Sequence, residues 1–596
     1  EEAQRAARVI SVGRRLDEAT IAELTGSASA QLTTALREAV AEQVLMADED
    51  GLLQFRHALL REAVYEDLLP GERGELHLAL ARLLEARPAT GEVSAADQAA
   101  MVAIHYAAAG HQPAALRASV LAALAARQVH AYGEAAEHAE RALELWPRVP
   151  EAERAVELDH VDLLVLAAST RSISDNRGRS EVLLQTALGE LDAAIDPRRY
   201  ASVLGRLARI QWNLNRGDEG RRTAQRALDL LEPGEESQER AALLAWLART
   251  EVLRGRYREA LGQGQAALQS AVAVGDRHTE IEVLNTLGMT QIALGHVEEG
   301  VASLRQAIDI ARQVNDLDGL GHAYSNLADL LGLRGHTAEA LEYAWEGLAA
   351  VPRRMIRLRT WLELTISELS LESGQWEIAA SHLGPEPSHL TGVPLIFRLL
   401  READVALGLG EEDRAARCLE EAEPLVEEST EPQWIGVLGA LLAELRRRRG
   451  DLDGAREAVE HSLDRIELCT EDVMRIARVT AAGARVEADA AQRARDLREP
   501  QEESATIASA RIHAQRLEAL AQDGGPVEEA WSAVGEAELA RAEGRPEPQL
   551  WAGAAEHWDG LGRPYPAAQC RFRQAEAHVE RAERDEAVSA AASALA

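Results

Sequence analysis

Lysine is absent from this chain of 596 residues, so all 64 of its basic residues are arginines. A phosphate-binding P-loop needs a lysine, and Schiff-base catalysis needs a lysine amine, so the chain can hold neither. A GC-rich coding sequence explains this bias most simply. Aromatic residues make up only 4% of the chain, and the abundance of alanine, leucine, arginine and glutamate favours helices.

Cysteines, net positive charge and long apolar runs are scarce or absent as well. Cys418, Cys469 and Cys570 lie far apart without metal-ligand spacing, which suits a reducing cytoplasm. No stretch reaches the roughly 18 apolar residues that a membrane helix requires, and the first residues do not form a signal peptide. With 99 acidic residues the net charge is −35. We therefore expect a cytoplasmic segment that contacts neither membranes nor, directly, nucleic acid.

Motifs for catalysis and metal binding are missing too. The 17 histidines show no His-x-x-Glu-His or similar metal spacing, and no Gly-x-Ser-x-Gly or other nucleophile motif occurs. We expect no catalytic site, metal or cofactor in this segment.

Pairs of small residues, twelve positions apart, recur eight times at intervals of 36 to 40 residues. The pairs are Ala168/Ser180, Ala208/Gly220, Ala248/Ala260, Gly288/Gly300, Ala328/Ala340, Ser367/Ala379, Ala403/Ala415 and Ala443/Ala455. Two helices approach closely only where neither carries a bulky side chain, so each pair predicts a helical hairpin. One hairpin cannot cover its own apolar face, so the repetition predicts an all-α solenoid.

The first 86 residues break this pattern. Helices are expected over 16–24 and 29–43, followed by Asp48-Glu49-Asp50-Gly51, a hairpin turn between two apolar segments, and a helix from about His57. This order predicts a winged-helix domain over 1–86, and its acidic balance favours packing against another domain over reading DNA. A linker is expected over 87–98, the repeats over 99–475, and further helical repeats with a cap over 476–596.

The blocks of about forty residues resemble tetratricopeptide repeats lengthened beyond their usual period. The resemblance rests on a leucine followed by a small residue, seen in Leu207-Ala208, Leu247-Ala248, Leu287-Gly288 and Leu327-Ala328. The expected fold is therefore a tetratricopeptide-like α-solenoid superhelix preceded by the winged helix.

A second resemblance is carried by Phe55-Arg56-His57-Ala58-Leu59-Leu60-Arg61-Glu62-Ala63-Val64-Tyr65, by the stretch from Tyr132 to Trp146, and by Leu561-Gly562-Arg563-Pro564-Tyr565. These segments resemble the large ATP-binding regulators of the LuxR family, which are bacterial signal-transducing ATPases. The resemblance implies an NTPase domain, with ATP or ADP, ahead of residue 1 and a DNA-binding domain after residue 596. This chain has neither, so it is expected to be the middle of a longer protein.

The same resemblance implies a role for His57. In related signal-transducing ATPases, a histidine in this part of the winged helix contacts the β-phosphate of ADP and helps to hold the resting state. His57 is therefore a candidate nucleotide-sensing residue that reaches the NTPase domain, with Arg56 and Arg61 as its interdomain neighbours. The alternative is a histidine that caps a helix or fills the core.

A second candidate site is the concave face of the solenoid. Positions expected to face the groove are Arg209, Trp212, Arg249, Asn285, His322, Asp329, Trp361 and Glu368. Two arginines followed by acidic residues would give a groove with opposite charge at its ends, suited to a charged small molecule or an extended peptide. The alternative is a solvated face whose charges serve solubility.

Together these observations favour the regulatory segment of a transcription factor. The repeats would bind a small-molecule or protein effector, and the winged helix would control the segment's own NTPase domain, with oligomers forming on activation. Two alternatives remain open: a scaffold that only collects partner proteins, and the sensor region of a cyclase or kinase of similar architecture.

Overall fold

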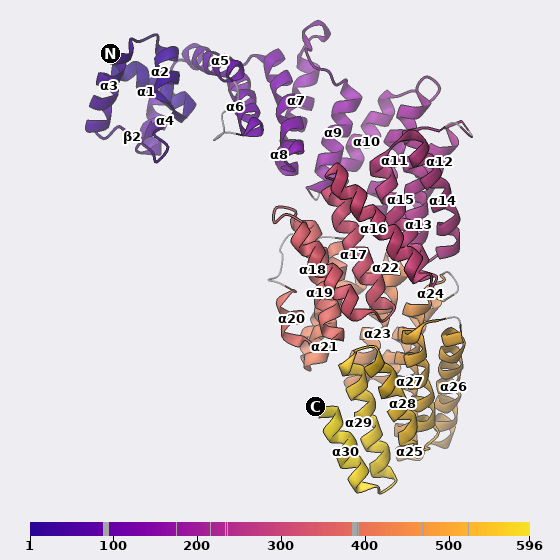
Figure 1. Cartoon of the computed structure of the whole chain (residues 1–596). Helices are drawn as coiled ribbons and strands as arrows, with labels where there is room; N and C mark the ends of the chain where they lie inside the picture. The colour runs from indigo at the N-terminus through magenta and orange to yellow at the C-terminus, as the bar shows by residue number, and fades with distance from the viewer. Residues whose placement is uncertain are drawn as a thin grey trace. The chain divides into compact units, whose positions relative to one another are not determined.

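The computed structural model describes residues 1–87, 94–174, 176–214, 216–232, 234, 236–383, 390, 392–467, 470–522 and 524–595. Over these residues the chain is almost entirely helical, with one small sheet (Figure 1). It divides into two compact units, Glu1–Ile210 and Gln211–Ala596. Cys469 and residues 88–93, half of the predicted linker, lie outside the described residues.

The first unit begins with four helices and three short strands. They are α1 (Glu2–Gly13), β1 (Arg15–Leu16), α2 (Glu18–Thr25), α3 (Ser29–Ala41), β2 (Leu45–Ala47), β3 (Leu53–Phe55) and α4 (Ala58–Asp67). The Asp17 side chain accepts the backbone N–H of Thr20 and caps α2, which ends at Gly26 in the left-handed conformation. β2 and β3 pair antiparallel across the predicted turn, where the Asp48 carboxylate accepts the N–H groups of Asp50 and Leu52.

The third strand of this sheet was not expected from the sequence. β1 pairs antiparallel with the other side of β3, so the strand order is β1-β3-β2. With only two residues, β1 is too short for an apolar alternation to reveal it. The helices and the sheet enclose one apolar core that includes Ile10, Ile21, Leu32 and Phe55.

Antiparallel helices make up the rest of the first unit. They are α5 (Pro70–Ala86), α6 (Ala95–Ala108), α7 (Gln112–Gln128), α8 (Tyr132–Leu145), the short 3-10 turns Trp146–Arg148 and Glu151–Glu153, α9 (His160–Ile173), α10 (Arg177–Glu190) and α11 (Pro197–Asn213), whose last residues belong to the second unit.

The second unit continues with helical hairpins. Its helices are α12 (Gly217–Asp229), α13 (Gln238–Leu253), α14 (Tyr257–Val274), α15 (Arg277–Ala293), α16 (Val297–Val314), α17 (Leu317–Leu333), α18 (Thr337–Ala350), α19 (Ile356–Glu372), α20 (Trp376–Ser381), α21 (Val393–Leu409), α22 (Glu412–Glu427), α23 (Pro432–Arg448), α24 (Leu452–Ile466), α25 (Val473–Leu497), α26 (Pro500–Gln522), α27 (Pro526–Ala542), α28 (Pro548–Gly560), α29 (Pro564–Glu580) and α30 (Arg584–Leu595).

The predicted small pairs mark the points where the two helices of a hairpin touch. Every member of the eight pairs is buried. A Cβ on Gly288 of α15 would lie 2.8 Å from the carbonyl oxygen of Gly300 on α16, a distance that no real side chain tolerates. In another hairpin, the Ser367 hydroxyl of α19 donates to the Ala379 carbonyl of α20 at 2.7 Å. These contacts confirm the helical solenoid.

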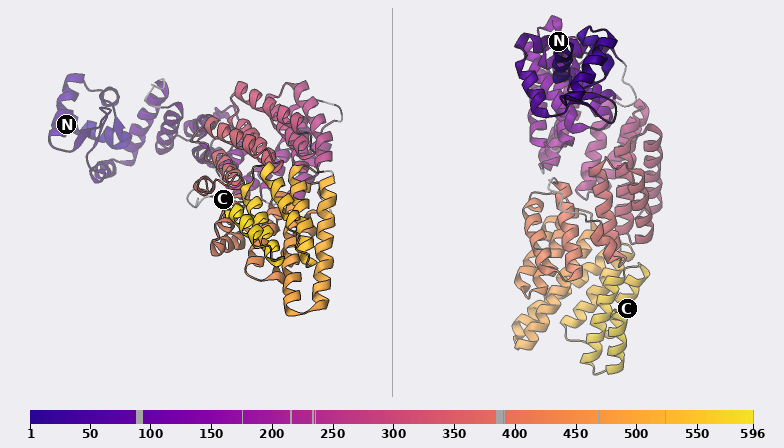
Figure 2. Two further views of the ribbon diagram at one scale, coloured as in Figure 1. Left: turned by 60° about the horizontal axis from the view of Figure 1, so that its bottom comes forward. Right: turned by 90° about the vertical axis from the view of Figure 1, so that its left-hand side faces the viewer.

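The superhelix of the second unit also contacts itself about five hairpins further along the chain. The Trp212 indole donates to the carboxylate of Glu431 at 3.2 Å. One hairpin on, the Tyr257 hydroxyl donates to Asp472 at 3.1 Å. Figure 2 shows the orange and yellow helices of the later repeats beside the magenta and pink helices of the earlier ones.

Glycines in the hairpin turns allow this close contact. At Gly335 and Gly374 the backbone has φ values of 89° and 75°, which L side chains rarely adopt. A Cβ on Gly335 would also meet the side chain of Leu561 at 2.5 Å, and one on Gly374 would meet Pro564 at 2.7 Å. The turns are thus the surfaces on which later repeats dock.

The first prediction concerns the helix crossings. Ala248 is fully buried against α14, so Ala248→Leu should overpack the crossing and lower the free energy of unfolding by ~1–3 kcal/mol. Urea denaturation measures this change. Ala266→Leu, at an exposed position of α14, is the control and should change it by less than about 0.5 kcal/mol. Equal effects would contradict the assigned register.

Candidate functional site

The segment around His57 lies at the start of α4 and is open to solvent. Residues 56 to 60 are all exposed, including Leu59 at 77% and Leu60 at 41%. His57 is the N-cap residue of α4, yet its side chain makes no capping hydrogen bond. Arg61 lies one turn later and donates to the carbonyl of Ser11 on α1 at 3.2 Å. Neither capping nor core packing therefore occupies the imidazole of His57.

In the second unit, several predicted groove residues meet around Glu431, which precedes α23. The two oxygens of this buried carboxylate accept the indole N–H groups of Trp212 and Trp434, at 3.2 and 3.0 Å. Trp361 of α19 lies 6.4 Å from the Trp434 ring and 5.0 Å from the ring of Phe397, between ring centroids. Burial raises the pKa of Glu431. The structure thus uses Trp212 and Trp361 in an aromatic cluster inside the superhelix.

His322 and Asn285 line the neighbouring hairpins. The side chain of His322 is half-buried, and burial together with the charges of Arg249 and Arg357 lowers its pKa to about 3, so its imidazole is neutral at pH 7. The Asn285 side-chain oxygen accepts an N–H of Asn326 at 3.1 Å. Arg209 lies on the part of α11 that belongs to the first unit and is half-buried there.

The acidic groove positions are matched by arginines of later helices. Glu368 pairs with Arg401 of α21, and Asp329 lies 4.0 Å from a guanidinium nitrogen of Arg475 on α25. Further along the same wall, Arg478 of α25 donates to Asp404 at 2.9 Å.

Glu444 of α23 is held by Arg447 and Arg448, at 2.9 and 2.7 Å, and by Arg485 of α25 at 3.5 Å. Despite burial, these guanidiniums hold the pKa of Glu444 far below its usual range. Within the described residues, the predicted acidic groove positions Asp329 and Glu368 therefore belong, with Asp404 and Glu444, to an internal network of ion pairs.

Two carboxylates of this network are poorly compensated. Glu372 lies one turn after Glu368 and pairs with Arg563 at 2.9 Å, while 25% of its side chain stays exposed. Burial raises the pKa of Glu372 to about 7, and Glu368 adds repulsion. Burial likewise raises the pKa of Asp329 to about 6. Both groups therefore titrate near neutral pH.

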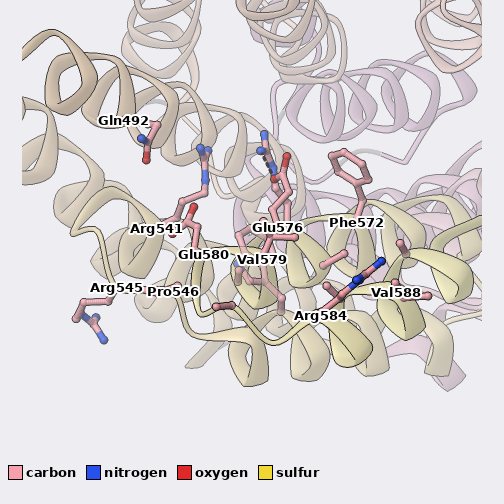
Figure 3. A pocket seen from close by; sticks show the side chains of 17 residues that line it. Gln492, Arg541, Arg545, Pro546, Phe572, Glu576, Val579, Glu580, Arg584 and Val588 are labelled. Atoms are coloured by element: carbon pink, nitrogen blue, oxygen red, sulfur yellow. Dashed lines mark hydrogen bonds and ion pairs between the residues drawn. The ribbon is translucent and has the colours of Figure 1, made fainter.

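A further pocket, of about 940 Å³, lies between the last two hairpins (Figure 3). This C-terminal pocket is lined by Gln492, Arg541, Arg545, Pro546, Trp551, Phe572, Arg573, Ala575, Glu576, Ala577, Val579, Glu580, Ala582, Arg584, Ala587, Val588 and Ala591. One feature of the sequence points to this pocket: Phe572, Val579 and Val588 are large apolar residues among charged neighbours near the end of the array.

Other kinds of site find no support in the part of the chain that the structure describes. There, no three histidine, cysteine, aspartate or glutamate residues gather as metal ligands would. Over the same residues, no helix combines the length and apolar character needed to cross a membrane.

A family model described as tetratricopeptide repeat matches residues 279–352. No curated protein sequence matches the chain. One solved structure to which the chain is similar is a signal-transduction ATPase with numerous domains and a tetratricopeptide repeat sensor, from Pyrococcus horikoshii. The two share 14% identity and a TM-score of 0.38, over 78% of this chain and 63% of that chain. The chain thus spans less than two thirds of that ATPase.

Two other solved structures are similar at comparable levels. A Rap protein complexed with competence and sporulation factor shares 13% identity and a TM-score of 0.42, over 58% of this chain and 98% of that one. The Cut9–Hcn1 hetero-tetramer of the APC/C gives 13% identity and a TM-score of 0.41, over 90% and 94%. Residues 279–352, which match the tetratricopeptide repeat, lie within a longer stack of similar helical hairpins. Helical-repeat stacks of this type serve as scaffolds for protein–protein interaction.

The second prediction concerns the pH dependence of stability. Because the fold raises the pKa of Glu372 from 4.5 to about 7, its contribution to stability is complete below pH 4.5 and is lost as the pH rises through 7. Glutamine mimics the neutral acid. Glu372→Gln should therefore gain stability relative to the wild type between about pH 5.5 and 8.5, by on the order of 2 kcal/mol.

Chemical denaturation at several pH values measures this difference. Glu444→Gln is the control, because Glu444 stays ionised throughout this window and its loss should cost the same stability at every pH. If the stability of Glu372→Gln changes with pH in parallel with that of the wild type, the fold does not raise the pKa of Glu372.

Proposed function

We propose that this chain is the regulatory segment of an ATP-dependent transcriptional regulator of the LuxR family. The superhelix binds an effector or partner protein, and the N-terminal part, as a winged helix, passes that event to an NTPase domain of the same protein. DNA binding, nucleotide binding and assembly into oligomers belong to the whole protein.

One observation carries this proposal: α4 presents an unpartnered face. None of its ten residues is buried, although Leu59 and Leu60 are large and apolar. Arg56 and His57 flank them, so basic groups adjoin an apolar patch. Such a patch on a charged surface is typical of a docking site for another domain. The resemblance of this segment to the family's nucleotide-sensing motif gives His57 its role there.

The mechanism requires two states of different effector affinity. In the resting state the winged helix contacts the NTPase domain, and the His57 imidazole donates to a phosphate oxygen of bound ADP. The effector must bind the released state more tightly than the resting state, because equal affinity would shift no population. Nucleotide exchange and assembly then follow release.

The third prediction tests this role in the full-length protein. His57→Ala should raise basal transcription and speed the release of bound ADP, because the resting state loses a phosphate contact. His296→Ala is a matched control: His296 is also an exposed N-cap residue without a capping hydrogen bond, but it lies at α16 in the repeats. Unchanged ADP retention and unchanged basal transcription for His57→Ala would refute the proposal.

The tetratricopeptide match over 279–352 also favours a simpler alternative, a scaffold that collects partner proteins. The gene on both sides of this segment distinguishes the two. A P-loop upstream and a helix-turn-helix downstream support the regulator, a cyclase or kinase domain supports a sensor of another enzyme, and neither supports the scaffold.

A further inference from the structure

The turn between α28 and α29, residues 561–565, docks on much earlier repeats of the second unit. The guanidinium of Arg563 donates to the carbonyl oxygen of Gly332, 231 residues earlier, at 2.5 Å. It also pairs with the carboxylate of Glu372 at 2.9 Å. This docking turn therefore joins the C-terminal hairpins to α17 and α19.

The side chains on either side of this guanidinium fit the surface that receives them. Tyr565 packs edge-on against Trp376 of α20, with 5.0 Å between the ring centroids, and its hydroxyl accepts from Arg448 at 3.4 Å. Leu561 and Pro564 lie against two glycines in the turns of the earlier hairpins, where any side chain would collide with them. The contact is therefore specific to this one turn.

The hairpins that carry the docking turn have an apolar core of their own. This core is formed by α27, α28 and α29 and includes Trp551 and Trp558. The two large clusters of buried residues in the earlier helices, from α15 to α25, include no described residue of α27, α28 or α29. Another small cluster joins α27 to α25 and α26 through the alanines at 488, 491, 510 and 542. Undocking the turn would thus leave the C-terminal core intact, so that these helices can move as one body.

The docked charges are incompletely compensated. Within the described residues, the Nε of Arg563 donates no hydrogen bond, and the Glu372 oxygen nearest to the guanidinium accepts none, although the two groups are close enough to form an ion pair. Undocking would return both groups to water. The docked state therefore carries a desolvation cost that the undocked state lacks.

Undocking is also linked to a proton. Burial raises the pKa of Glu372 from 4.5 to about 7 in the docked state, and contact with water would restore the lower value. The docked state therefore holds the proton more tightly, and a rise from pH 6 to 8.5 increases the ratio of undocked to docked molecules by about tenfold. The other charged groups around Glu372 are Glu368 of α19, Arg401 and Asp404 of α21, Arg478 of α25 and Arg563 of the docking turn.

We propose that the docking turn is a latch, which holds the C-terminal hairpins against α17, α19 and α20 and opens as Glu372 loses its proton. When the latch opens, α27, α28 and α29 swing away from the earlier repeats as one body. This inference rests on the proposed function for its biological use, because it names the contact that separates two states of the superhelix.

Double electron–electron resonance between two nitroxide labels on the 596-residue chain tests the latch. The labels are attached through Glu342→Cys on α18 and Glu556→Cys on α28, at two exposed positions. Cys469→Ser removes one native thiol, and Cys418 and Cys570 are buried. At pH 6 the chain should give mainly the docked distance.

Arg563→Ala should add a population whose distance is longer by at least about 10 Å, the diameter of a helix. In the wild type, the ratio of the long to the short distance should rise about tenfold from pH 6 to 8.5, whereas Glu372→Gln should stay docked at both pH values. Arg571→Ala is the matched control, because Arg571 of α29 pairs with Asp559 within the same hairpin and its loss should leave the distance unchanged. Circular dichroism and the melting temperature verify that each variant folds.

Four results would overturn the proposal. Arg563→Ala could keep the docked distance, Arg571→Ala could lengthen it equally, or Glu372→Gln could respond to pH as the wild type does. In the fourth, the longer distance would appear only with a loss of helical circular dichroism, which would mean that the hairpins unfold instead of swinging. The measurement needs no nucleotide, so its failure leaves the role of His57 standing, and an inert His57→Ala leaves the latch standing.

Discussion

The close approach of paired helices is the constraint on which the rest of this structure depends. At Gly288 and Gly300 the backbones of α15 and α16 leave no room for a Cβ, and at the other seven pairs a buried small residue occupies each helix. Each hairpin is therefore thin, so that hairpins can stack tightly. Tight stacking lets the second unit curve until later repeats reach earlier ones, which places Glu431 beside Trp212 and Arg563 beside Glu372.

Self-contact changes the character of the concave surface. In an open solenoid, the acidic residues Asp329, Glu368, Asp404 and Glu444 would face water, where exposed ion pairs contribute little. Here they face arginines from α21, α23 and α25 in positions that water reaches poorly. Removing one partner of such an ion pair would leave a buried charge uncompensated and would strongly destabilise the fold. The network thus fixes one arrangement of the repeats, and the raised pKa of Glu372 shows where compensation is incomplete.

The repeats could be predicted from the sequence because their signal is local and repeated. A small pair twelve residues apart encodes one crossing, and eight copies confirm one another. The hairpin of β2 and β3 was also predictable, since Asp48 and Gly51 specify its turn. The contact between early and late repeats could not be predicted, because Trp212 and Glu431 are 219 residues apart and no sequence pattern near either residue identifies the other as its partner. For the same reason, the sequence placed Trp212 and Trp361 in a groove without showing the aromatic cluster that contains them.

The contacts between distant repeats also bear on how the second unit can move. Contacts such as Trp212 with Glu431 and Arg563 with Glu372 join distant repeats, so a change in the curvature of the second unit would have to break them. A rigid hairpin array then carries a displacement along its length, because close-packed helices move as bodies instead of deforming. The small residues at the crossings and the arginines of the ion pairs therefore determine how the hairpins of the second unit are held together.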